Sequence, residues 1–143
     1  MRPHIVQPGR GPAYDWSQDR IVIKAPLDLS DGRVTVAEDT LKPGFHLPPH
    51  RHCSMVEIFY ILEGEVTFTF EDEVRTATPG TAVTVPAGVS HDVACPLGGR
   101  LLTIFTPGGF EHYLAELAAL SPAQLNDADT VRGLGERYDI WPD

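Results

Sequence analysis

The stretch GFHLPPHRHCSMVEIFYILEG, residues 44–64, decides the fold and carries three candidate functional residues. His50 and His52 are one residue apart, and Glu57 follows five residues later. In a strand, side chains at positions i and i+2 point to the same face, so both imidazoles are expected to project into one space. Glu57 has the wrong parity to join them on an uninterrupted strand. We therefore expect a bend over residues 53–56, after which Glu57 and Phe59 share one face.

A second stretch, GTAVTVPAGVSHDVAC (residues 80–95), supplies a fourth candidate ligand, His91. Imidazole nitrogens combined with a carboxylate oxygen suit a first-row divalent metal ion. The sequence therefore predicts one divalent transition metal held by His50, His52, Glu57 and His91. Residue types alone do not separate Fe, Mn, Ni, Cu and Zn, because these ions overlap in their ligand preferences.

The two stretches together resemble the two motifs of the cupin superfamily, in order and in internal spacing. The matching patterns are Gly44-(5)-His50-x-His52-(4)-Glu57-(6)-Gly64 and Gly80-(5)-Pro86-x-Gly88-(2)-His91-(3)-Cys95. The resemblance implies an all-β fold, the double-stranded β-helix or jelly-roll barrel, with a short helical segment after it. It also implies that the four candidate ligands occupy the metal positions of cupins. One position departs from the family, because cupins usually have Asn where this chain has Cys95; that position is not a usual ligand.

Short β-type runs with turn residues between them, and no helix among them, independently indicate a sandwich or barrel. The Glu63-Gly64 pair, between two such runs, predicts a hairpin. The expected strands are residues 21–23, 33–39, a run from 45, then 58–62, 65–70, 74–78, 82–85, 91–94 and 101–106.

We expect three parts along the chain: an N-terminal arm (1–20), a cupin β-barrel (21–107) and a C-terminal helical extension with a tail (108–143). The arm is rich in Pro and Gly, so it is expected to be irregular and to pack on the barrel or on a partner subunit. Apolar residues at helical spacing predict a helix over 113–120. Ser121 to Gln124 resembles a capping box with proline at the first helical position, which predicts a second helix. The tail from residue 127 is polar, with three expected anchors: Tyr138, Ile140 and Trp141.

Composition narrows the classes of function. The 143 residues fit one domain, and 20 acidic against 11 basic residues give a formal net charge of −9. This charge disfavours binding to nucleic acid or to anionic membranes. The sequence has no apolar run of the length that spans a membrane, no apolar signal segment and only two cysteines, so a cytoplasmic, reduced protein is expected. The family resemblance further suggests a homodimer.

The expected substrate pocket is largely apolar. Met55, Phe59 and Val93 are near the ligands in sequence, Cys95 shares the parity of His91, and His46 precedes His50 at the expected mouth. Such a lining suits an aromatic or weakly polar small molecule better than a sugar phosphate, which would require a cation.

The sequence leads to three functional hypotheses. The first is a metal-dependent small-molecule enzyme, an oxygenase of the dioxygenase-like kind acting on an aromatic or enolisable substrate. Glu57 is its catalytic residue, able to ligate the metal in one state and accept a substrate proton in another. The resemblance extends to small bacterial cupins described as quercetin-dioxygenase-like, and flavonol-cleaving cupins suggest this role for the matching glutamate. The alternatives are a redox-neutral isomerase, cyclase or decarboxylase, and a non-catalytic small-molecule binding module.

Overall fold

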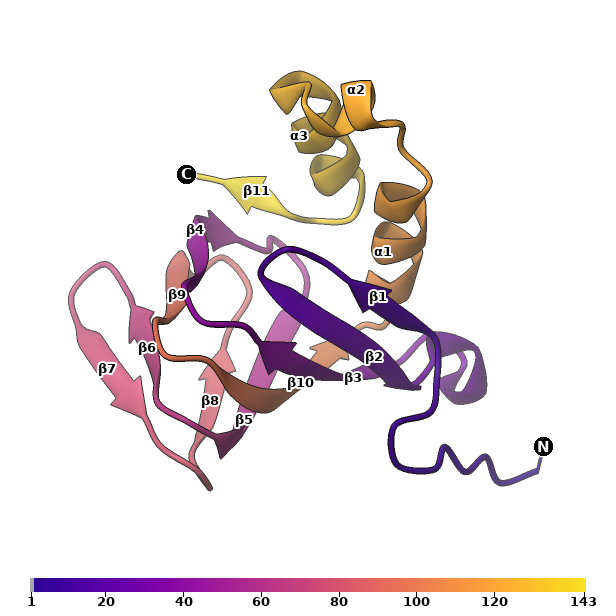
Figure 1. Ribbon diagram of the computed structural model, residues 1–143, viewed down its shortest axis with the longest axis horizontal. Helices are drawn as coiled ribbons and strands as arrows, with labels where there is room; N and C mark the ends of the chain where they lie inside the picture. Colours follow the sequence, from indigo (N-terminus) through magenta and orange to yellow (C-terminus); the bar gives the residue numbers. More distant parts are fainter. Residues whose placement is uncertain (1) are drawn as a thin grey trace.

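The computed structural model describes residues 2–143 as two antiparallel sheets that face each other, with helices at one end (Figure 1). The first sheet has the order β1-β2-β3-β10-β5-β8 and the second has the order β11-β4-β9-β6-β7. The predicted all-β double-stranded β-helix with a C-terminal helical segment is confirmed. The strands are β1 Ala13–Asp15, β2 Asp19–Ala25, β3 Thr35–Leu41, β4 Phe45–Arg51, β5 Val56–Glu63, β6 Val66–Thr69, β7 Val74–Ala77, β8 Ala82–Val85, β9 His91–Cys95, β10 Gly99–Thr106 and β11 Trp141–Pro142.

The main core lies between the two sheets and follows from the alternation of side chains along the strands. Val66 and Phe68 of β6 and Val93 and Cys95 of β9 are at most 1% exposed. A second apolar cluster lies beside it and receives Leu114 from the C-terminal helices, together with Met55 and Phe105. Burial is therefore densest on the inner faces, where the candidate ligands also lie.

The predicted hairpin at Glu63-Gly64 is wrong. Strand β5 belongs to the first sheet and β6 to the second, so the chain crosses between the sheets at this point. Gly64 has φ +83°, and a Cβ on it would lie 2.7 Å from the carbonyl oxygen of Gly98. Glycine is therefore needed here for a close approach of two backbones as well as for the turn.

The C-terminal segment contains three helices: α1 Phe110–Ala118, α2 Pro122–Leu125 and α3 Ala128–Arg137. The predicted capping box is confirmed, with Ser121 and Gln124 bonding to each other's backbone N–H. Helix α3 was not expected, since Gly133 and Gly135 lower helical propensity within a polar tail. Beyond α3 the chain returns to the barrel, where β11 pairs with β4, the strand that carries His50 (Figure 1).

The first twenty residues are not irregular throughout, because β1 pairs with β2 at the edge of the first sheet. Tyr14 and Trp16 stack with their ring centroids 6.4 Å apart and pack on the second apolar cluster. A short 3-10 helix, Leu27–Ser30, leads from β2 toward β3. None of the helices within residues 2–143 is long and apolar enough to cross a membrane.

Candidate metal centre

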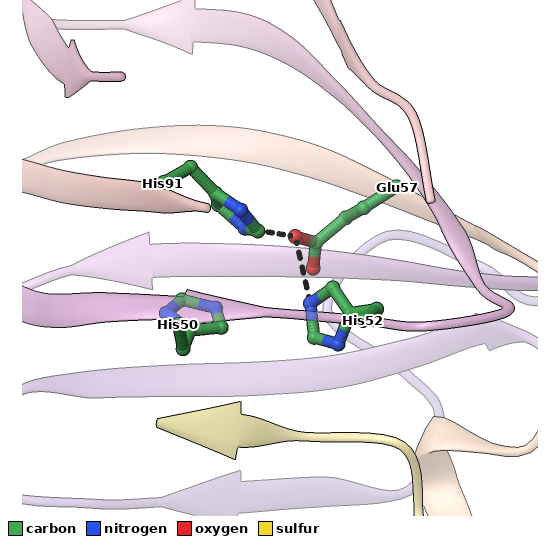
Figure 2. A group of neighbouring side chains, drawn as sticks. All are labelled: His50, His52, Glu57 and His91. Carbon is green, nitrogen blue, oxygen red and sulfur yellow. Dashed lines mark hydrogen bonds and ion pairs between the residues drawn. The ribbon is translucent and has the colours of Figure 1, made fainter. Parts of the chain in front are cut away.

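Four side chains from both sheets converge at one end of the barrel (Figure 2). His50 lies on β4, His52 directly after it, and His91 opens β9 in the second sheet; Glu57 comes from β5 in the first. One ligand atom from each residue lies within 4.8 Å of all the others. The structure therefore brings together the four residues that the sequence singled out, and this cluster could hold a metal ion.

An irregularity in β4 directs His50 into this space. Leu47 is opposite Val93 and His50 is opposite His91, so three steps along β4 match two along β9. The extra residue lies at Pro48-Pro49, where the missing backbone N–H groups favour a break in the ladder. Because the bulge changes the parity of the strand, Leu47 and His50 both face inward.

The bend between His52 and Glu57 occurs where it was expected, and a distant residue holds it. Asp139, between α3 and β11, accepts hydrogen bonds from the backbone N–H groups of Cys53, Ser54 and Met55 at 2.6, 2.8 and 2.9 Å. This contact could not be predicted from sequence, since nothing local to residue 139 indicates its partner.

Each of the three histidines uses Nδ1 in a hydrogen bond to a backbone carbonyl. The acceptors are the oxygens of Pro48 for His50 (2.8 Å), Asp139 for His52 (2.8 Å) and Val89 for His91 (3.0 Å). A carbonyl oxygen can only accept, so each Nδ1 carries the proton. In a neutral ring the Nε2 atom then has a free lone pair, which is the arrangement of metal-binding imidazoles.

The inward-facing atoms fit a divalent metal ion. Nε2 of His91 lies 3.2 Å from Oε1 of Glu57, and Nε2 of His52 lies 3.5 Å from the same oxygen. Nε2 of His52 is also buried without a hydrogen-bond partner within the described residues. Lone pairs of neutral imidazoles and a carboxylate do not satisfy one another, whereas a cation between them satisfies all.

Burial and charge act differently on the ligands. Burial would raise the pKa of Glu57, but without a metal ion the hydrogen bonds and positive charge of His52 and His91, when their Nε2 atoms are protonated, lower this pKa to about 2. Burial lowers the pKa of His50, which favours its neutral, metal-binding form. For His52, burial is outweighed by Glu57 and the Asp139 carbonyl, and its pKa is raised. A metal ion must therefore displace any proton on His52.

The cluster opens onto a cavity of about 640 Å³, which we call the outer cavity. It lies between the barrel end and the C-terminal helices, and most of its lining is apolar. The barrel contributes Leu47, Pro48, Pro49, His50, His52 and Glu57; the C-terminal segment contributes Phe110, Tyr113, Leu125, Val131, Arg132 and Ile140, among others.

A smaller inner cavity of about 170 Å³ lies within the barrel. Glu57 lines both cavities, and the inner one also contains two acidic side chains, Asp19 and Asp39. Burial, with the neighbouring charge of Asp19, raises the pKa of Asp39 to about 9, and burial also raises the pKa of Asp19. Asp39 therefore stays protonated at neutral pH, and its Oδ1 has no hydrogen-bond partner within residues 2–143.

The expected pocket residues fall into two groups. Phe59 and Val93 line the inner cavity. The other three line neither cavity: His46 points outward and bonds to Asp92 at 2.6 Å, Met55 packs in the second apolar cluster, and Cys95 is buried in the main core. His46 differs from the expectation because the Pro48-Pro49 bulge gives it the opposite parity to His50.

Sequence reasoning missed the outer wall of the outer cavity. Tyr113 belongs to the apolar stripe of the predicted helix, but the helical spacing of these residues could not show which part of the barrel the stripe faces. Val131 and Ile140 lie in the segment interpreted as a polar tail with anchors. They lie beside the candidate ligands only because the chain returns over the barrel after α3.

Comparison with known proteins agrees with this architecture. Residues 37–106 match the family model of the cupin domain. This region is a domain of the cupin superfamily. The matched region contains β4 to β10 and all four candidate ligands, and the predicted family membership is confirmed.

Individual cupins show how far the likeness extends. Quercetin 2,3-dioxygenase from Bacillus subtilis (strain 168) is 25% identical over 116 residues, or 80% of this chain, and the chain spans only 34% of that enzyme. Among solved structures, KdgF from Halomonas sp. has a TM-score of 0.67 at 18% identity, covering 76% of this chain and 99% of its own. An RmlC-like cupin from Shewanella frigidimarina has a TM-score of 0.68 at 20% identity, covering 78% and 96%. At these identities the structural likeness concerns the fold.

Proposed function

We propose that this cupin is a metal-dependent oxygenase that acts on an aromatic or enolisable small molecule. The observation that carries the proposal is the position of the ligand cluster, which lies where a large, mostly apolar cavity meets the barrel. A pocket of this size that combines apolar walls with convergent polar groups suits a small organic ligand. The limited identity to quercetin 2,3-dioxygenase supports the oxygenase class.

His50, His52, Glu57 and His91 would hold one divalent transition metal, bound through three imidazole nitrogens and a carboxylate oxygen. A redox-active ion at this position would supply Lewis-acid and electron-transfer chemistry. Glu57 borders both cavities, so its carboxylate can also accept a proton from an enol or phenol in the outer cavity.

The walls of the outer cavity favour a weakly polar substrate. Phe110 and Tyr113 contribute aromatic surfaces to the lining, and among residues 2–143 Arg132 is its one lysine or arginine side chain. Arg132 also lies 3.4 Å from Glu136 on the same helix. A phosphorylated substrate is therefore poorly matched, while a flavonol or β-diketone fits the lining.

Oxygen uptake with quercetin and acetylacetone tests the proposal, using protein reconstituted separately with Fe, Mn, Ni, Cu and Co. Replacing Glu57 by Gln should lower kcat by about 10²–10⁴-fold, since it removes the proton acceptor. His46→Gln is the matched control, because His46 lies outside both cavity linings. If none of the metal forms consumes oxygen with either compound, the proposal is rejected for these substrate classes.

A redox-neutral reaction is the second candidate, and the inner cavity favours it. Asp39 holds a proton there while Glu57 is ionised, and such a pair can divide the acid and base roles of an isomerase, cyclase or decarboxylase. Activity of the Zn form without oxygen would select this candidate. Strict dependence on oxygen would select the oxygenase.

A further inference from the structure

Asp139 contacts four consecutive residues, His52 of the candidate metal centre and the three residues that follow it, although it lies far away in the sequence. Its carboxylate accepts from the backbone N–H groups of Cys53, Ser54 and Met55, and its carbonyl oxygen accepts from Nδ1 of His52 at 2.8 Å. His52 and Asp139 are separated by 87 positions along the chain. One residue of the C-terminal segment thus binds His52 and three of the four residues between His52 and Glu57.

The carboxylate contact holds the bend that directs Glu57 inward. Three successive N–H groups of a bend have no partner in a sheet ladder, and an ionised carboxylate is a strong acceptor for them. Trp141 adds a fourth donor, with its indole Nε1 lying 3.0 Å from Oδ1 of Asp139. The bend therefore has a fixed shape, and the parity change that turns Glu57 toward His52 depends on it.

The carbonyl contact acts on His52 directly. It keeps the proton on Nδ1 and leaves Nε2, which is buried and has no hydrogen-bond partner among residues 2–143, facing Glu57 and His91. The carbonyl points this way because Asp139 adopts φ +64°, a left-handed conformation that aspartate reaches more readily than most residues. Both contacts therefore arise from one residue in one backbone conformation.

We propose that Asp139 is a positioning residue of the metal centre, which sets the orientation of His52 and Glu57 and connects them to the C-terminal wall of the outer cavity. This inference rests on the proposed metal binding. Its neighbour Ile140 and the helical residue Gly135 both line the outer cavity, so the segment that encloses a substrate also orients the ligands. Asp139 acts through the ligands and touches no reacting atom.

Metal affinity, measured with Co²⁺ in competition with a chromogenic chelator, tests this role independently of activity. Asp139→Gly keeps the left-handed backbone and the carbonyl but removes the carboxylate. We expect it to weaken Co²⁺ binding by about 10–100-fold, the usual effect of losing a group that orients a ligand. The visible Co²⁺ bands should shift as well, because the ligand geometry changes. Asp139→Asn keeps one acceptor oxygen and should lose less affinity.

Two controls separate positioning from general stability. Asp31→Gly is the same substitution at the other left-handed aspartate, with φ +56°, whose side chain has no hydrogen bond within the described residues. Asp127→Ala removes the N-cap of α3 and weakens the same C-terminal segment without touching His52. Both should bind Co²⁺ within about twofold of wild type, since neither contacts a ligand.

The inference is overturned if Asp139→Gly binds Co²⁺ like the wild type with an unchanged spectrum. It is also overturned if Asp127→Ala, at an equal loss of thermal stability, weakens binding as much. If Asp139→Gly does not fold, the affinity and spectrum of Asp139→Asn decide in the same way. Wild-type protein that binds no Co²⁺ would reject this inference and the proposed metal site together. Expected Co²⁺ results without turnover would reject only the proposed activity.

Discussion

At the scale of single residues, Asp39 makes stability depend on pH in an unusual direction. Its pKa is about 9 in the folded protein against an ordinary value of 3.8, so the folded state binds the proton more tightly than the unfolded state between these values. The free energy of unfolding therefore falls as pH rises through this window. Asp39→Asn keeps the shape and removes the titration. We expect its melting temperature to exceed that of wild type by about 5 °C near pH 8, and the difference to shrink near pH 5.

Thermal unfolding at several pH values measures this effect. Asp72→Asn, at an exposed acidic turn between β6 and β7, is the matched control and should leave the pH profile unchanged. If the melting temperatures of Asp39→Asn and wild type change with pH in parallel, Asp39 is not the cause of the pH dependence of stability.

The cluster of candidate ligands could be predicted from sequence, while the residues that contact this cluster could not. His50, His52 and Glu57 lie within eight positions, and strand parity with one bend relates them locally. Asp139 is 87 positions away from His52 in the sequence, and the Oδ1 atom of Asp39 becomes buried because β3 lies in the middle of a sheet between β2 and β10. No local pattern encodes such partners, because sheet order is a property of the whole chain.

At the scale of elements, the chain crosses between the sheets at Gly64, and any side chain at this position would be strained. Gly64→Ala combines a left-handed φ, which costs about 1–2 kcal/mol, with a Cβ 2.7 Å from the Gly98 oxygen. We expect a loss of more than about 2 kcal/mol in the free energy of unfolding, measured by urea denaturation.

Gly80→Ala is the matched control for that change. Gly80 has φ +90°, but a Cβ there meets nothing within 4 Å, so only the conformational cost remains. The difference between the two variants isolates the contact with Gly98. Equal losses would mean that the backbones at the crossing can move apart at little cost.

The strands were largely predictable because alternation marks each one separately. Residues 82–85 were predicted with the bounds of β8, and the other predicted strands overlap the observed ones. The pairing was not predictable at Glu63-Gly64, since a glycine turn shows only that the chain changes direction. Whether it forms a hairpin or crosses to the other sheet depends on β8 and β10, which pair with β5.

At the scale of the whole molecule, the proposed metal ion would connect the two sheets, since Glu57 and the histidines come from opposite ones. An ion that binds only the folded protein stabilises it by about 2.7 kcal/mol at a hundredfold excess over Kd. For a chain of this size we expect Co²⁺ or Mn²⁺ to raise the melting temperature by roughly 5–10 °C, and EDTA to reverse the shift.

His50→Gln serves as the control, because His50 is the least buried of the four residues and its loss should disturb the core least. The metal-dependent rise in melting temperature should be much smaller in this variant. An equal rise would mean that the ion binds elsewhere, for example at the exposed His46 and Asp92 pair.

The pairing of β11 with β4 implies an order of assembly during synthesis. All strands of the two sheets except the short β11 are complete at Thr106, whereas Asp139 leaves the ribosome more than thirty residues later. A nascent chain can therefore collapse its apolar core while His52 and the following bend still lack their hydrogen-bond partners. Metal capture would come last, after the C-terminal segment has closed over the barrel, so an ion met earlier by the growing chain would find the ligands unaligned.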